Sequence, residues 1–390
     1  MTPRHAFAVV SPEEAFASLG DAWRELLASS ASDTIFLTPE WMEAWWRSCG
    51  EGRRGAVVTA RRGGALVALA PLQVVPERWR GAWTFRTLRF LSDGTYDADY
   101  LDLVAAPDTA AEVAPELWAW LRRGSPLRFD LARWNEIPAA SSAATSFDGA
   151  LRARGDLIEV ERVGAMIAAL PPRWEDYVAS LRPRMRTKIR SLRRDLEASH
   201  QVRLVACDSE RDLDARLASL FDLHQRRWTA EGQGGVFAGA RKRAFYHALS
   251  RVLLDRGWLR FHSLEVDGAF VAHQYCMGYR GTVYLLQEGY DPAWVEHGVG
   301  NVLRAMVLEG LIAEGCTAYD FLAGVTDHKR SWGGTVKESL RLFARGPTPA
   351  GALVALAERS ARAIRARRRA AAPPPGPGPG PGPAAGEATP

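Results

Sequence analysis

The chain has 390 residues, of which 47% are hydrophobic, and this is enough to bury the cores of two domains. The formal net charge is +5, and much of the basic excess lies in the ranges 182–194 and 362–369. The four cysteines form no CxxC pair, which argues against a zinc site and a disulfide framework and fits a reducing cytoplasm. No stretch approaches the roughly 20 apolar residues that span a bilayer, and the first residues lack the apolar run of a signal peptide. We expect a soluble, cytoplasmic protein without a membrane span or a bound metal.

The first elements in chain order are two helices and a hairpin. Ser11 is a capping residue, followed by a proline and two glutamates, and predicts a helix that runs to about Ala28. A second, aromatic-rich helix begins at Pro39 and ends near Gly50. Two apolar strands then join at the turn 63–64. The rest of this half is predicted as a helix at 110–123, a strand at 127–132 and a polar stretch with a connection at 141–155.

A similar order of elements follows in the second half. Two strands meet at Asp267–Gly268, and residues 63–68 match 267–272 position for position. This order predicts an internal duplication. In the first half the segment SDGTYDADYLDLV (92–104) stands where the second half has a glycine loop that opens a helix. Asp97 and Asp99 of this segment resemble a DxD metal clamp, but we expect them to be solvated loop residues.

The region 282–324 reads as strand, glycine loop, helix and strand. Its loop is His297-Gly298-Val299-Gly300-Asn301, at a position where a helix would begin. Unpaired amides at a helix N-terminus attract a phosphate, and glycines let the ligand approach the backbone. We therefore expect a cradle for the phosphates of a substrate or cofactor here. The alternative is a strand-to-helix turn that holds no ligand.

A strongly basic helix is predicted at 182–199, between the halves. Met185, Ile189, Leu192 and Leu196 recur at helical spacing, and six basic residues occupy the other faces. A packed helix with a charged exterior is the simplest interpretation. Contact with tRNA or an acidic glycan is the alternative.

The order of these motifs resembles the GNAT superfamily, and within it the FemAB-like, cellulose-biosynthesis-type acetyltransferase branch. The similar segments are YLLQEGYD, HGVGN, YDFLAG and HKRSW, with PEWMEAWW and ALVALAPL in the first half. The resemblance covers about residues 30–345. It implies an α+β fold of two tandem GNAT-like domains, each with a mixed central sheet flanked by helices. We place these domains at 1–155, without a cradle, and 156–348, followed by a basic helix at 349–370 and a disordered Pro/Gly tail at 371–390.

The resemblance implies direct acyl transfer, without a covalent enzyme intermediate, with the donor phosphates on residues 297–301. Asp291 and Glu288 would then accept a proton, and the ammonium of Lys329 would neutralise phosphate or a developing oxyanion. Asp291 before a proline also fits a plain turn, and Lys329 also fits a solvated surface residue. The residues expected to bind substrate are Tyr290, His224, Arg227, Trp228 and Trp332. His273 and Gln274 are neighbours on a strand, so only one of them can point into a cleft.

The resulting hypothesis is an N-acyltransferase that uses acetyl-CoA or another acyl-CoA, and no metal. The acceptor would be an amine on an envelope or polysaccharide precursor or on a small metabolite. One alternative is a Fem-type transferase with an aminoacyl-tRNA donor, which would give the basic helix a role. Another is a non-catalytic protein that binds a polyanion and has a vestigial cradle. The sequence leaves the acceptor and the oligomeric state open.

Overall fold

A computed structural model describes residues 4–79, 81, 83–95, 97–230 and 235–371 of the chain. The first half contains strands and helices in mixed order, as the sequence predicts. Its elements are β1 (Ala6–Val10), α1 (Pro12–Ala28), η1 (Ile35–Leu37), α2 (Pro39–Cys49), β2 (Arg54–Arg62), β3 (Ala65–Trp79), β4 (Trp83–Phe90), α3 (Pro107–Arg123), β5 (Leu131–Pro138) and α4 (Ser142–Ala153).

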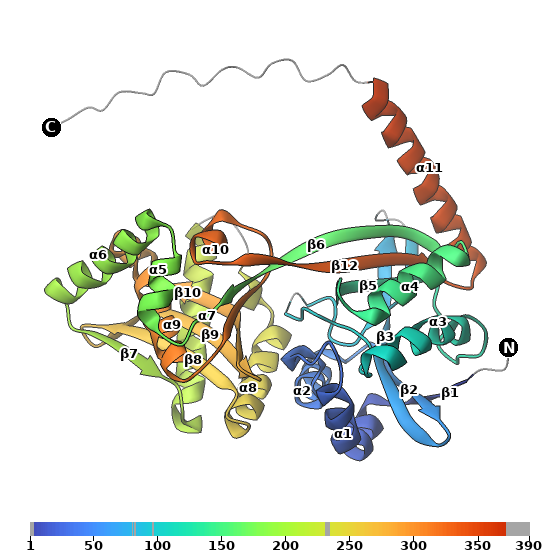
Figure 1. Cartoon of the computed structure of the whole chain (residues 1–390), viewed down its shortest axis with the longest axis horizontal. Coiled ribbons are helices and arrows are strands. Elements are labelled where there is room, and N and C mark those ends of the chain that lie inside the picture. Colours follow the sequence, from blue (N-terminus) through green and yellow to red (C-terminus); the bar gives the residue numbers. More distant parts are fainter. Residues whose placement is uncertain (1–3, 80, 82, 96, 231–234, 372–390) are drawn as a thin grey trace.

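The second half begins with a long strand and ends with a helix that projects from the body (Figure 1). Its elements are β6 (Leu157–Ala169), α5 (Trp174–Ser180), α6 (Pro183–Ser199), β7 (Val202–Ala206), α7 (Glu210–Ala230), η2 (Val236–Ala238), α8 (Ala240–Asp255), β8 (Leu259–Val266), β9 (Ala269–Tyr279), β10 (Thr282–Tyr290), η3 (Pro292–His297), α9 (Val299–Ala313), β11 (Ala318–Ala323), α10 (Asp327–Ser331), β12 (Thr335–Arg345) and α11 (Pro349–Ala371).

The two halves repeat one strand arrangement. Antiparallel strands β2, β3 and β4 lead to β5, which pairs with β4 in parallel. Antiparallel strands β8, β9 and β10 lead in the same way to β11, which pairs with β10 in parallel. Helices α3 and α9 make the two equivalent crossovers. The duplication predicted from the hairpin pattern is therefore present in the topology.

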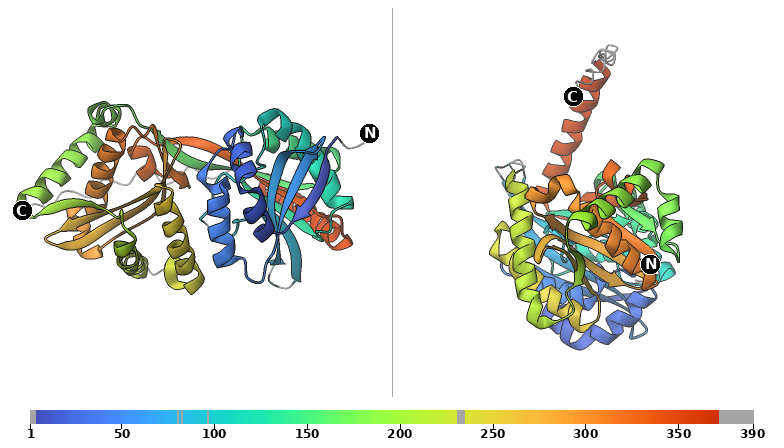
Figure 2. Two further views of the ribbon diagram at one scale, coloured as in Figure 1. Left: turned by 90° about the horizontal axis from the view of Figure 1, so that it is seen from below. Right: turned by 90° about the vertical axis from the view of Figure 1, so that its left-hand side faces the viewer.

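Strands β6 and β12 join the halves. The structure has one 12-stranded sheet in the order β1-β2-β3-β4-β5-β12-β6-β11-β10-β9-β8-β7, where two separate central sheets were expected. The sheet is continuous because β12 pairs with β5 along one edge and with β6 along the other. Figure 1 shows this long two-stranded ribbon crossing from one half to the other, and Figure 2 shows the halves side by side.

Aromatic side chains pack the halves against each other. Phe36 of η1 meets Tyr284 of β10 with ring centroids 5.5 Å apart, and Trp41 of α2 meets Phe245 of α8 at 5.4 Å. All four rings are almost fully buried. Burial of large aromatic surfaces is the main favourable term at such a contact, so the halves form one packed unit.

Three further predictions can be compared with the structure. The polar stretch 141–155 contains helix α4, which Ser141 caps by accepting the amide of Ala143 and which buries Phe147 and Leu151. The predicted strand 127–132 begins later, as β5. The basic helix α6 buries its apolar seam, as expected.

No helix in the described ranges is long and apolar enough to cross a membrane. The predicted helix at 349–370 is present as α11. The tail expected to be disordered lies almost entirely outside the described residues, which end at 371.

Candidate active site

The predicted glycine loop forms the start of helix α9. The short helix η3 ends at His297, and Gly298 then takes a left-handed conformation with φ +61°. The amides of Asn301 and Val302 bond back to the Gly298 carbonyl at 2.8 and 3.2 Å. The amides of Val299 and Gly300 have no acceptor among the described residues. The strand–loop–helix geometry expected from the sequence is therefore present, with two free donors at a helix N-terminus.

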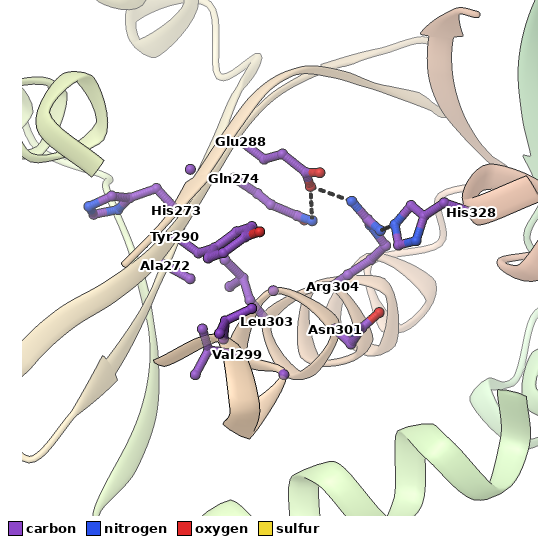
Figure 3. Close-up of a pocket in the computed structure, with 14 residues that line it drawn as sticks. Ala272, His273, Gln274, Glu288, Tyr290, Val299, Asn301, Leu303, Arg304 and His328 are labelled. Atoms are coloured by element: carbon purple, nitrogen blue, oxygen red, sulfur yellow. Dashed lines mark hydrogen bonds and ion pairs between the residues drawn. The ribbon is translucent and has the colours of Figure 1, made fainter. Parts of the chain in front are cut away.

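These donors border a cavity of about 270 Å³ (Figure 3). Helix α9 forms one side, strands β9 and β10 form the other, and His328 closes one end. A Cβ on Gly300 would lie 3.7 Å from the ring of Tyr290, so a larger side chain there would fill this space. His297 does not line the cavity, because its ring packs against His200 and Trp294. The cradle consists of residues 298–301 rather than 297–301.

A buried arginine organises the inner end of the cavity. Arg304 of α9 is 2% exposed, forms an ion pair with Glu288, and contacts Nε2 of His328 at 2.5 Å (Figure 3). Burial favours the neutral form, but the Glu288 carboxylate outweighs it and the pKa of Arg304 lies above its usual value. Arg304 was not among the site residues predicted from the sequence. An arginine between the apolar residues Leu303 and Ala305, in a largely apolar helix, was the available signal.

Glu288 is held in place from β9 as well. Gln274 donates to Glu288 Oε2 at 3.4 Å, and the Tyr319 hydroxyl donates to Gln274 Oε1 at 3.3 Å. His273 points the other way, between the hydroxyls of Ser219 and Ser263. Burial lowers the pKa of His273 to about 3, so its ring is neutral. Of these two neighbours, only Gln274 directs its side chain into the cavity, as strand alternation requires.

Tyr290 and Asp291 have different positions. Tyr290 lines the cavity beside Gly300. Asp291 caps η3 by accepting the Ala293 amide at 3.0 Å and pairs with Arg226 at 3.1 Å. Asp291 is not part of the cavity lining, so the structure fits the plain turn rather than the proton acceptor.

Lys329 is in α10, where it contacts the end of β11. Its Nζ donates to the carbonyls of Leu322 at 3.1 Å and Ala323 at 2.6 Å. Burial lowers the pKa of Lys329, and the carboxylates of Asp99, Asp320 and Glu288 oppose this shift. The Lys329 ammonium therefore interacts with carboxylates on both sides of the sheet. It is not the freely solvated lysine of the alternative interpretation.

Two other expected substrate contacts, Trp332 and His224, are not in the cavity lining. Trp332 is completely buried, with Arg304 5.4 Å from the centre of its ring, so it packs beneath the site and not at its rim. His224 of α7 is 3% exposed, and its ring packs on Phe237. The side chains of Arg227 and Trp228 lie outside the described residues.

A second cavity lies on the first-half side of the same strands. Strands β10 and β11 pair only from Thr282 to Tyr284, and beyond this point β10 pairs with β9 alone while β11 stays with β6. Residues 285 and 286 of β10 line the second cavity, whereas 288–290 line the first. The second cavity has a volume of about 520 Å³, and we call it the interhalf cleft. The diverging strands thus have a cavity on each side.

Comparison with known proteins indicates the class of domain to which this site belongs. Residues 183–330 match the family model of the acetyltransferase (GNAT) domain. No curated protein sequence matches the chain. These residues include the basic helix, the cradle, Arg304 and Lys329.

Three solved structures share the overall fold. FemX has a TM-score of 0.62 at 11% identity, over 90% of this chain and 100% of FemX. A conserved protein of unknown function from Bacteroides thetaiotaomicron has a TM-score of 0.53 at 12% identity, over 87% and 99% of the two chains. The C-terminal domain of a putative lysylphosphatidylglycerol synthetase from Agrobacterium fabrum has a TM-score of 0.51 at 10% identity, over 88% of this chain and 96% of that domain.

The family-model match therefore indicates an acyltransferase domain of the GNAT type within this chain. Residues 183–330 form its GNAT acetyltransferase domain. The whole chain has the two-halved fold of FemX, which agrees with the resemblance to the FemAB-like branch.

Proposed function

We propose that the protein transfers an acyl group from an acyl-CoA thioester, in particular acetyl-CoA, to the amine of an acceptor. The observation that supports this most directly is the cradle, where two free amides and the positive end of the α9 dipole face a cavity. The donor would place its phosphates there and its acyl arm between the diverging strands β10 and β11. The acceptor would enter from the interhalf cleft, so the two substrates meet across the sheet.

The residues around the cradle would position the substrates and stabilise the charge that develops during transfer. The ion pair with Arg304 fixes the orientation of Glu288. The Lys329 ammonium, held on two β11 carbonyls, would stabilise negative charge on the acyl oxygen. We propose these roles for Glu288, Arg304 and Lys329, and a positioning role for Tyr290 beside the donor.

Thermal stabilisation by the donor tests the cradle. Acetyl-CoA at about 100 times its dissociation constant should stabilise the protein by roughly 2.7 kcal/mol. Gly300→Val should remove the shift, because its side chain would enter the space beside Tyr290 while the helical backbone is kept. Gly310→Val is the matched control, since Gly310 is in the same helix and a Cβ there meets no atom within 4 Å. Absence of a shift with acetyl-CoA and longer thioesters would refute the donor, and a shift that survives Gly300→Val would refute the cradle.

An aminoacyl-tRNA donor is the second candidate, and the basic helix α6 is the observation that favours it. Arg184, Lys188 and Arg190 are exposed and form no ion pair with the described residues. Helix α6 passes beside the cradle, since the side chain of Leu192 lies against Gly298. Binding of uncharged tRNA should then weaken steeply with salt and with Arg184→Gln/Lys188→Gln. Binding without salt dependence would eliminate this donor.

A further inference from the structure

The segment Asp97–Tyr100 of the first half reaches into the second half. It lies between β4 and α3, the position that corresponds to the cradle loop between β10 and α9. Asp97 accepts hydrogen bonds from Lys242 and Tyr246 of α8. The Tyr100 hydroxyl donates to Asp320 of β11 at 2.8 Å. Where the second half has a phosphate cradle, the first half thus supplies a polar segment to the wall of the interhalf cleft.

Asp99 lines the cleft together with its neighbours Asp97 and Ala98. It is 8% exposed, and its Oδ2 accepts the amide of Ala323 at 2.9 Å. Ala323 is the last residue of β11, and its carbonyl accepts the Lys329 ammonium. Oδ1 of Asp99 has no donor among the described residues. This oxygen is not among the fully buried polar atoms that lack a partner, so it opens to the cleft, where a ligand can reach it.

The other charges of the cleft are already paired. Arg341 binds Glu136 at 2.5 Å and Glu161 at 3.5 Å. Arg89 binds Glu77 and Asp93, and Arg133 also binds Glu77. The lining contains five carboxylates and three guanidinium groups, and Lys242 of α8 pairs with Asp97, so Asp99 is the lining carboxylate without a direct ion pair among the described residues. The ionisable residues of the lining are Arg89, Asp93, Asp97, Asp99, Arg133, Glu136, Glu161 and Arg341.

The electrostatic surroundings make Asp99 a proton acceptor near neutral pH. Burial and the Glu136 carboxylate raise the pKa of Asp99 to about 7, and Asp320 adds to this effect. The Ala323 amide and the Lys329 ammonium act in the opposite direction. Glu288 on the donor side is already committed to Arg304 and Gln274. Asp99 therefore has both the free oxygen and the proton affinity that a base requires.

We propose that Asp99 takes the proton of a cationic amine acceptor in the interhalf cleft, and that the cleft therefore selects acceptors that enter as ammonium ions. This inference rests on the proposed function and adds the acceptor class. One proton passes from the ammonium to Oδ1, and the freed nitrogen lone pair attacks the thioester carbonyl carbon. The C–N bond forms, the C–S bond breaks, and the thiolate leaves with the second nitrogen proton as a thiol. Asp99 then releases its proton to solvent.

A matched pair of amines tests the selectivity. 1,4-Diaminobutane carries a second ammonium where 4-aminobutyrate carries a carboxylate, and the two are similar in length. The full chain with coenzyme A, which has no acyl group to transfer, should bind the diamine at least tenfold more tightly than 4-aminobutyrate in calorimetry at pH 8. At pH 6.5, where Asp99 is mostly protonated, diamine binding should release a proton. Equal binding of the two amines, or no binding of the diamine, would overturn the proposal.

The variant Asp99→Asn shows whether Asp99 acts as a base or has only a structural role. Asparagine keeps an oxygen for the Ala323 amide, so the melting temperature and the shift with acetyl-CoA should be retained. Proton release should disappear, and transfer to the diamine should fall by about 100-fold or more in kcat. The exposed Asp108→Asn is the control. A variant that still releases the proton, or keeps its rate, would refute the role of Asp99. Loss of the acetyl-CoA shift in the unmodified protein would instead refute the proposed function.

Discussion

The ion pair between Arg304 and Glu288 predicts an unequal pair of stability changes. The side chain of Arg304 is 3% exposed, whereas that of Glu288 is 33% exposed. Glu288→Met leaves a cation buried without its partner, and breaking a buried pair in this way costs about 3–5 kcal/mol. Arg304→Met leaves a carboxylate that water can still reach, so we expect a smaller loss of about 1–3 kcal/mol.

The double variant Arg304→Met/Glu288→Met should recover part of this loss. Removing both charges leaves no unpaired ion in the site, so the double variant should be more stable than the sum of the single effects by about 2 kcal/mol. Urea unfolding of the full chain, followed by near- and far-ultraviolet circular dichroism, measures all three changes. Coincident curves from the two probes would support a two-state analysis.

A surface ion pair between α6 and α9 provides the control. Arg193 and Glu309 are 2.7 Å apart, with side chains 35% and 42% exposed. Arg193→Met should therefore cost no more than about 1 kcal/mol. If Glu288→Met costs no more than this control, and the double variant is additive, then Arg304 and Glu288 do not form a buried unit.

Two further predictions concern Asp102 and Gly298. Burial raises the pKa of Asp102 from 3.8 to about 6, so its stabilising contribution is complete below pH 3.8 and is lost as pH rises through 6. The free energy of unfolding of Asp102→Asn, relative to that of the unmodified protein, should therefore rise by about 3 kcal/mol between pH 3.5 and pH 7 in urea titrations. A difference that stays constant over this pH range would contradict this prediction. Gly298→Val should lower the melting temperature in calorimetry and remove the stabilisation by acetyl-CoA. The reason is that the φ of Gly298 is +61° and a new Cβ would lie 2.7 Å from Leu192. An unchanged melting temperature would show that a side chain is tolerated at this left-handed position.

Local sequence signals predicted much of the fold. The hairpin turns, the capping serine of α1 and the glycine loop of α9 depend on residues that are close in the chain, and each is present. Helix α4 was read as a connection because its small polar residues hide the helical spacing of Phe147 and Leu151. A cap at Ser141 was the signal that could have corrected this.

The positions of individual site residues were predicted less well than the secondary structure. Asp291 and Trp332 stood beside recognisable motifs, yet one caps a turn and the other is buried. Arg304 was not predicted as a site residue, and the expectation that Asp97 and Asp99 are solvated loop residues is wrong, since both are buried. Arg304 and Asp99 each gain their position from residues distant in the chain. Arg304 meets Glu288 and His328, and Asp99 meets the end of β11.

The sequence by itself determined the class of elements, the duplication and the place of the cradle, because these depend on hydrophobic period, turn residues and glycine within short windows. Only the tertiary structure decided that β12 joins both halves in one sheet and that the first half supplies Asp99 to the second. Pairing between strands and burial of a charge depend on contacts between residues far apart in the chain. A carboxylate becomes a candidate base only when the folded surroundings remove its water and leave one oxygen free.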